Sequence, residues 1–155
     1  MTNPDLLNST KKYFLFVLIL ISSFVTLRSQ VTNRILFIFD DSYSMNAPWS
    51  SSTPKIFVAK QVLGEFMDSL KSVPNLEIAL RCYGHQTFFR PERDCKDTKL
   101  EVPFAPASQN YTKIKQRIQK LEPQGTTPIA YSLGQCAADF PPKENVRNIV
   151  ILITD

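Results

Sequence analysis

The chain has 155 residues, of which 43% are hydrophobic and 11% aromatic, a composition typical of one globular domain that buries a core. Its formal net charge is +4; without residues 1–29, 15 basic and 13 acidic residues remain and the charge is +2. A charge this small argues against a nucleic-acid-binding protein and against binding to an anionic membrane surface.

The first 29 residues are predicted to be a targeting segment. Two lysines precede an apolar stretch, residues 13–27, which is shorter than the roughly 20 residues that span a bilayer comfortably. A positive region followed by about 7–15 apolar residues is typical of a secretory signal peptide, with cleavage expected after Ser29. The residues before Ser29 do not form a good small-x-small cleavage site, so an uncleaved membrane anchor stays open. Either way, the domain of residues 31–155 is expected to be exported.

Four strands are predicted after the leader. The apolar runs at 35–39 and 146–154 are typical of strands that are buried on both faces. Residues 76–83 alternate between apolar and polar side chains, which predicts a strand with one buried face. Residues 100–104 are expected to form an edge strand, because Pro103 cannot donate a hydrogen bond to a neighbouring strand.

Three helices are predicted from apolar residues at helical spacing, and they cover residues 54–72, 108–121 and 128–140. Thr53 is expected to cap the first of them, with Pro54 at the first helical position. The stretch between the first strand and this helix is polar and rich in turn-forming residues, and it contains Trp49. Strands that alternate with helices indicate an α/β fold around a mostly parallel sheet.

Polar residues follow the first strand at every second position: Asp40, Ser42 and Ser44. In open α/β sheets, ligands bind beyond the carboxyl ends of the strands. One carboxylate and two hydroxyls can therefore point into one space there, and oxygen ligands suit a hard cation such as Mg²⁺. Asp41 is expected to face solvent.

Two later segments carry further oxygen-bearing residues that could belong to the same site. Gly125-Thr126-Thr127-Pro128 places a threonine directly before a helix that starts with proline, and the last apolar strand ends on Asp155. Together, the three segments resemble the metal-ion-dependent adhesion site of the von Willebrand factor A (vWA) family. Residues 83–85 and 94–98 resemble the bacterial secreted form of this family. The matching positions are Asp40, Ser42, Ser44, Thr127 and Asp155.

The resemblance implies a three-layer, Rossmann-like fold whose edge strand is antiparallel. It also implies that Ser42, Ser44 and Thr127 bind Mg²⁺ or Mn²⁺ directly, and that the two aspartates act directly or through water. An acidic side chain of a partner protein would fill the open position of the cation. Family domains continue beyond the third motif, so the chain is expected to carry an N-terminal, incomplete part of the domain.

Two other classes of function stay open. A structural vWA module could use the metal for stability only. A metal-dependent phosphohydrolase of the haloacid dehalogenase type is disfavoured, because its second aspartate would stand at the position of Ser42. A serine hydrolase is disfavoured too, since no Gly-x-Ser-x-Gly motif is present and the single histidine, His85, has no evident partner. We therefore expect a binding protein and not an enzyme.

Cys82, Cys95 and Cys136 are an odd number of cysteines in an exported chain. Cys82 and Cys136 lie on apolar faces and are expected to pack as buried thiols. The resemblance implies that Cys95 pairs with a cysteine beyond Asp155, and a Cys82–Cys95 bridge is the alternative. A zinc site is not expected, because the chain has no Cys-x-x-Cys motif and no cluster of cysteine and histidine.

Overall fold

The computed structural model describes residues 30–50, 52–91 and 93–155. The predicted signal peptide or anchor, residues 1–29, lies outside the described residues. Within the described ranges, no helix is both long enough and apolar enough to cross a membrane. These ranges cover nearly all of the predicted domain of residues 31–155.

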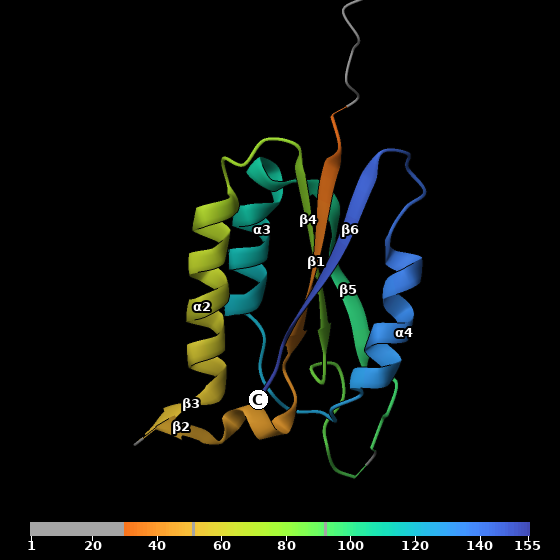
Figure 1. The fold of residues 1–155 in the computed structure, drawn as a ribbon. Helices are drawn as coiled ribbons and strands as arrows, with labels where there is room; N and C mark the ends of the chain where they lie inside the picture. Colours follow the sequence, from red (N-terminus) through yellow and green to blue (C-terminus); the bar gives the residue numbers. More distant parts are fainter. Residues whose placement is uncertain (1–29, 51, 92) are drawn as a thin grey trace, which may run out of the picture.

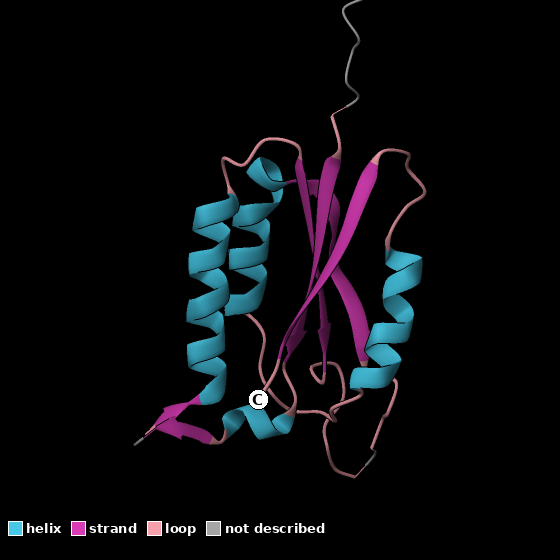
Figure 2. Cartoon of the chain, viewed as in Figure 1, coloured by secondary structure: helices cyan, strands magenta, loops and turns pink. Residues whose placement is uncertain are grey.

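A single four-stranded sheet forms the centre of the described domain (Figure 1, Figure 2). Its strands lie side by side in the order β5 (Thr98–Pro106), β4 (Leu76–Tyr83), β1 (Thr32–Asp40) and β6 (Val146–Ile153). β1 is parallel to both β4 and β6, whereas β5 is antiparallel to β4. The predicted mostly parallel sheet and its antiparallel edge strand are confirmed.

The described α-helices cover both faces of this sheet; they are α2 (Lys55–Leu70), α3 (Ala107–Gln119) and α4 (Ile129–Asp139). Figure 1 shows α2 and α3 next to each other on one face and α4 on the other. The domain therefore has three layers, as expected. Each helix begins and ends within two residues of its predicted bounds.

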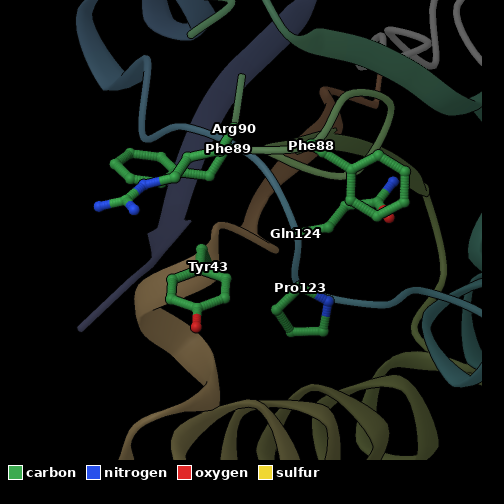
Figure 3. A pocket seen from close by; sticks show the side chains of 6 residues that line it. All are labelled: Tyr43, Phe88, Phe89, Arg90, Pro123 and Gln124. Atoms are coloured by element: carbon green, nitrogen blue, oxygen red, sulfur yellow. The ribbon is translucent and has the colours of Figure 1, made fainter. Parts of the chain in front are cut away.

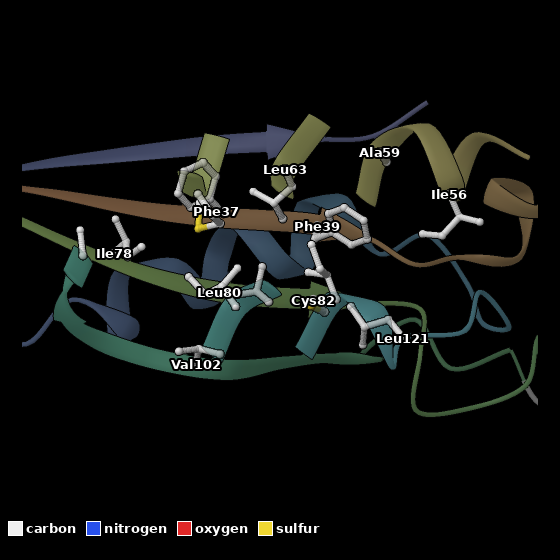
Figure 4. Close-up of a cluster of buried hydrophobic side chains, with 14 of the residues drawn as sticks. Phe37, Phe39, Ile56, Ala59, Leu63, Ile78, Leu80, Cys82, Val102 and Leu121 are labelled. Atoms are coloured by element: carbon white, nitrogen blue, oxygen red, sulfur yellow. The ribbon is translucent and has the colours of Figure 1, made fainter. Parts of the chain in front are cut away.

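The apolar run of β1 divides the core between the two faces of the sheet. Successive side chains of a strand alternate, so Phe37 and Phe39 pack on the side of α2 and α3, while Leu36 and Ile38 pack on the side of α4. All four are fully buried. Figure 4 shows the larger cluster, between the sheet and the pair α2 and α3. Burying one such side chain contributes about 1.5–3 kcal/mol.

β4 is buried on both faces, so the prediction of one exposed face is wrong. The charged side chains on its polar face are paired instead of solvated. Arg81 donates two hydrogen bonds of 2.6 Å to Asp139 at the end of α4, and Glu77 accepts one of 2.8 Å from Arg34. A buried charge is tolerated where a partner satisfies it. The alternation of apolar and charged residues in β4 is therefore compatible with a central strand that is buried on both faces.

β6 is less buried than its apolar sequence predicts. Val150 is 41% exposed and Leu152 is 36% exposed. Among the described residues, β6 pairs only with β1 and forms one edge of the sheet. Every second side chain therefore remains open to solvent, and the expectation of a strand buried on both faces is wrong for this structure.

The segment between β1 and α2 is more regular than predicted. It contains a short 3-10 helix, η1 (Tyr43–Asn46), and a hairpin of β2 (Pro48–Ser50) and β3 (Thr53–Pro54). The prediction that Thr53 caps α2 is wrong. Thr53 pairs with Ser50 in the hairpin, Pro54 is the N-cap without a side-chain cap, and the N–H of Lys55 donates to the carbonyl of Ala47 (2.9 Å). Backbone pairing thus replaces the hydroxyl cap.

All three cysteines are free thiols. Cys82 and Cys136 are buried in the clusters on opposite faces of the sheet, as expected, and burial raises the pKa of both. Cys95 is exposed. The alternative Cys82–Cys95 bridge is not formed, and a partner for Cys95 beyond Asp155 stays a prediction.

Candidate functional site

The predicted site lies where β1 and β6 end, at the carboxyl edge of the sheet (Figure 1). Asp40, the last residue of β1, is fully buried. Its Oδ1 accepts a hydrogen bond from the N–H of Ser42 (2.9 Å), and its Oδ2 accepts one from the hydroxyl of Thr154 (2.7 Å). Both oxygens of Asp40 therefore hold other groups of the site in place.

Tyr83 extends this arrangement behind the site. Its hydroxyl donates to Thr154 Oγ1 (3.2 Å), which in turn donates to Asp40. Burial raises the pKa of Tyr83 well above its usual value, so the phenol stays protonated and remains a donor. The end of β4 thus supports the junction between β1 and β6.

The two serines of the motif lie close together at the start of η1. Ser42 Oγ and Ser44 Oγ are 3.1 Å apart, and Ser44 Oγ donates to Oδ1 of Asp155 at 3.4 Å. Ser42 is fully buried, whereas Ser44 is exposed. Ser44 therefore contacts two other predicted positions, Ser42 and Asp155, and Asp40 is joined to them through the backbone of Ser42.

Asp155 also has a basic partner. Lys55 Nζ, at the start of α2, lies 2.6 Å from its Oδ2. This hydrogen bond lowers the pKa of Asp155, which is therefore ionised at neutral pH. Sequence reasoning missed this pair, because only the tertiary fold brings the start of α2 to the end of β6.

The loop that carries Thr127 is fixed against η1 by its backbone. The N–H of Tyr43 donates to the carbonyl of Gly125 (2.9 Å), and Ser42 forms a parallel bridge with Gly125. Gly84 has φ 75°, and a Cβ on it would come within 2.5 Å of the Thr126 carbonyl oxygen and 2.7 Å of Ser42 Cα. Only glycine fits there, and this close approach holds three loop segments together.

The two threonines of this loop differ in their surroundings. Thr126 is buried, and its hydroxyl donates to the carbonyl of Asp94. Thr127 is exposed, and within the described residues its hydroxyl makes no hydrogen bond. The structure therefore leaves Thr127 free at the site, but it does not bring its hydroxyl into contact with the other four positions.

Asp41 is fully buried, so the prediction that it faces solvent is wrong. Its N–H donates to the carbonyl of Tyr83 (2.9 Å), which continues the pairing of β1 with β4 and turns the side chain inward. Neither carboxylate oxygen has a hydrogen-bond partner among the described residues. Burial raises the pKa of Asp41 to about 7, although the charge of Lys60 opposes this rise.

Asp97 is a second buried carboxylate that sequence reasoning missed. It accepts hydrogen bonds from the N–H groups of Gln86 and Thr87, at 3.0–3.2 Å, and from the Thr87 hydroxyl at 2.9 Å. These bonds order the loop after β4, which lies against the Thr127 loop. The only sequence signal would have been a lone aspartate in a polar stretch, which is too common to interpret.

His85 belongs to a hydrogen-bonded cluster with Glu101 and Arg117, which includes none of the five positions. Its Nε2 lies 2.8 Å from Glu101, which also accepts a 2.6 Å hydrogen bond from Arg117. Burial disfavours the charge on Glu101, but the bonds from Arg117 and His85 outweigh burial and lower its pKa to about 2. The arrangement gives His85 a role in holding β5 and α3 against the loop after β4.

The two serine oxygens of the candidate donor set have a spacing that suits a small divalent cation. Mg²⁺ binds oxygen at about 2.0–2.1 Å in an octahedron, so adjacent ligands lie about 2.9 Å apart. The 3.1 Å between the hydroxyl oxygens of Ser42 and Ser44 is close to this value. Within the described ranges, no group of three or more His, Cys, Asp or Glu side chains could hold a metal ion. The candidate set differs from such groups because it combines two carboxylates with three hydroxyls. The distance between its two serine oxygens is compatible with a bound Mg²⁺.

Sequence comparison finds no matching protein-family model and no matching curated protein. Similarity is found among solved structures. The vWF domain of the type V pili tip protein Mfa5 from Porphyromonas gingivalis aligns over 81% of this chain and 38% of its own, with a TM-score of 0.61 and 18% identity. The conserved hypothetical protein BatB from Bacteroides thetaiotaomicron aligns over 77% of this chain and 51% of its own, with a TM-score of 0.57 and 18% identity.

A third similar structure is the pilus adhesin SpaC from Lactobacillus rhamnosus GG, with a TM-score of 0.66, 16% identity, and coverage of 83% of this chain and 16% of SpaC. The chain thus spans about half of BatB and smaller parts of the other two. At these identities the likeness concerns the fold. The resemblance to the von Willebrand factor A family is therefore supported at the level of the fold.

Proposed function

We propose that residues 31–155 form an exported, non-enzymatic binding domain that recognises a protein partner through a divalent cation, Mg²⁺ or Mn²⁺. The cation would be held by Asp40, Ser42, Ser44, Thr127 and Asp155. The observation that carries the proposal is the meeting of the Ser42, Ser44 and Asp155 oxygens where β1 and β6 end. Residues 1–29, as signal peptide or anchor, would export the domain.

The chemistry of the donor set favours binding over catalysis. Neutral hydroxyls leave much of the charge of a bound cation uncompensated where the two aspartates act through water, and Mg²⁺ keeps open positions for outside ligands. An acidic side chain of a partner is the natural ligand for such a position. Asp40, held by Ser42 N–H and the Thr154 hydroxyl, would orient the serine pair.

The similar structures support the same class of function. Mfa5 is described as a pili tip protein and SpaC as a pilus adhesin. Both descriptions concern proteins that act at the cell surface, which agrees with an exported protein-binding domain. These descriptions support only the class of function, a binding domain. Neither description identifies the partner of this chain.

The place of the donor set supports one second candidate. A metal held there would join the ends of β1 and β6. A structural domain, whose metal would serve stability only, is the alternative.

Calorimetric titration of Mg²⁺ into the purified protein tests the proposal. The matched variants are Asp40→Ala and Asp68→Ala; Asp68 is an exposed aspartate on α2, paired with Lys115. We expect binding to the unchanged protein and to Asp68→Ala, and its loss in Asp40→Ala. Equal heats for Asp40→Ala and Asp68→Ala would refute the site.

Thermal unfolding with and without a chelator separates the two candidates. For the binding domain, the chelator abolishes partner binding and shifts Tm only by the small amount expected from mass action. A large fall in Tm, with binding retained wherever the fold survives, would favour the structural alternative.

A further inference from the structure

An aromatic groove lies beside the candidate cation site, lined by Tyr43, Phe88, Phe89, Arg90, Pro123 and Gln124, with a volume of about 500 Å³. Figure 3 shows these six side chains, which come from η1, from the loop after β4 and from the loop before Thr127. Tyr43 stands between Ser42 and Ser44 in the sequence, and its N–H donates to the carbonyl of Gly125 in the Thr127 loop, so one residue belongs both to the groove and to the segment that carries the serines.

The groove exposes aromatic rings to solvent. Tyr43 is 60% exposed and Phe88 is 69% exposed. The rings of Tyr43 and Phe89 are nearly parallel, at an interplanar angle of 15°, and their centroids are 6.0 Å apart. Aromatic side chains gathered in a concave site are typical of surfaces that bury an apolar or aromatic group of a partner.

The backbone holds this groove in shape. The N–H of Phe89 donates to the carbonyl of Gln124 (2.6 Å), and the N–H of Gln124 donates to the carbonyls of Asp41 and Gly84 (3.3 Å each). Buried Asp97 fixes the residues just before Phe88. A preformed groove binds with less loss of conformational entropy than a mobile loop does.

The charge of the groove favours an acidic partner. Of its six lining residues, Arg90 is basic and none is acidic. Arg93 lies over the Phe89 ring, with Cζ 5.0 Å from the centroid, and is exposed. Arginines beside exposed rings complement a segment that carries both a carboxylate and an aromatic side chain.

We propose that the aromatic groove binds a partner segment in which an aromatic residue directly follows the acidic residue that ligates the cation, with a second acidic residue after it. The aromatic ring would enter the groove between Tyr43 and Phe88, and the second carboxylate would pair with Arg90 or Arg93. This inference rests on the proposed cation site and adds the chemistry of the partner to it.

Blocked heptapeptides titrated into ¹⁵N-labelled protein, followed by NMR, test this inference. The probe is Gly-Ser-Asp-Phe-Glu-Gly-Ser, compared with versions in which Phe is replaced by Ala or Glu by Gln. Each titration is repeated with excess Mg²⁺ and with a chelator. The protein variants are Phe88→Ser in the groove and Phe57→Ser as the control, because Phe57 is 61% exposed on α2.

With Mg²⁺, we expect the Phe peptide to bind about tenfold more tightly than the Ala peptide. Phe88→Ser removes this preference and Phe57→Ser keeps it, and the amide shifts gather at residues 43 and 88–90. Replacing Glu by Gln in the peptide weakens binding by a smaller factor.

The other outcomes separate the two proposals. Equal, Mg²⁺-dependent binding of the Phe and Ala peptides would overturn the groove inference and leave the cation site standing. A Phe preference that survives the chelator and vanishes in Phe88→Ser would uphold the groove and refute the cation bridge. The absence of shifts with every peptide would reject the partner segment as stated.

Discussion

The ammonium group of Lys55 lies 2.6 Å from Oδ2 of Asp155, although the two residues are 100 positions apart in the sequence. The other oxygen of the same carboxylate accepts the 3.4 Å hydrogen bond from Ser44. Lys55 is therefore a positive charge at the edge of the candidate cation site. A divalent cation there would compete with this ammonium group for Asp155.

Replacing Lys55 with methionine is expected to raise the affinity for Mg²⁺ by roughly threefold to tenfold. The variant removes a positive charge that repels the cation, and the size follows from the modest strength of a partly exposed ion pair. Calorimetric titration measures the change. Lys115→Met is the control, because it breaks a surface ion pair of similar length with Asp68 (2.7 Å). Unchanged or weaker Mg²⁺ binding in Lys55→Met would show that Asp155 is not a ligand.

Substitutions of the two neighbouring threonines are expected to have different effects. Replacing Thr127 should weaken metal binding, and replacing Thr126 should lower stability. Thr127→Val, which loses an exposed hydroxyl, is expected to weaken Mg²⁺ binding at least about tenfold without changing stability in a chelator. Thr126→Val loses a buried hydrogen bond and is expected to lower the free energy of unfolding by about 1 kcal/mol. Titration and denaturant unfolding of both variants test this. The reverse pattern would assign the ligand role to Thr126.

Because of the Glu101 cluster, the free energy of unfolding is expected to fall as the pH becomes acidic. The pKa of Glu101 falls from 4.5 to about 2 on folding, so its contribution to stability is present above pH 4.5 and is lost as the pH falls through about 2. Glu101→Gln is expected to lower the free energy of unfolding at pH 7 by up to about 3 kcal/mol. The gap between variant and unchanged protein is expected to close toward pH 2.

Denaturant unfolding across this pH range measures the effect of Glu101. Glu122→Gln, at an exposed position, is the control and is expected to stay within about 0.5 kcal/mol of the unchanged protein. A gap between Glu101→Gln and the unchanged protein that persists at pH 2 would mean that the variant acts by packing and not through the charge of Glu101.

Gly125 is expected to tolerate no side chain. A Cβ there would come within 2.7 Å of both Asp97 Oδ2 and the carbonyl oxygen of Thr87. Gly125→Ala is therefore expected to cost about 1–3 kcal/mol and to disturb the loops of the site and groove. Gly64→Ala is the matched control: nothing lies within 4 Å of its added Cβ, inside α2, so a gain of about 0.5–1 kcal/mol is expected. Equal thermal stability of the two variants would contradict this role of Gly125.

Local patterns in the sequence were sufficient for the layout of the fold. The apolar run before Asp40 predicts a buried strand, helical spacing predicts α2, α3 and α4, and Pro103 indicates an edge strand. These features depend on residues only a few positions apart, because the periods of helices and strands are local. The position of Asp40, Ser42 and Ser44 just after a strand follows from the same information.

Burial and pairing were decided only by the tertiary structure. Alternation made β4 appear half exposed, but α4 covers its polar face and supplies Asp139 to Arg81. Asp41 is buried, although a carboxylate after a strand would ordinarily face water. Which face a residue presents depends on the neighbouring elements, and local sequence does not specify them.

The candidate site, too, has features that the local sequence specifies and features that only the tertiary structure specifies. The sequence by itself determined the residue types of the candidate donor set and their place at strand ends. Only the tertiary structure decided that Lys55 meets Asp155, that Thr127 and not Thr126 is free, and that Tyr43 joins Phe88 and Phe89 in one groove. The physical reason is that these contacts join segments far apart in the chain, whose distances are set by the packing of the whole sheet and its helices.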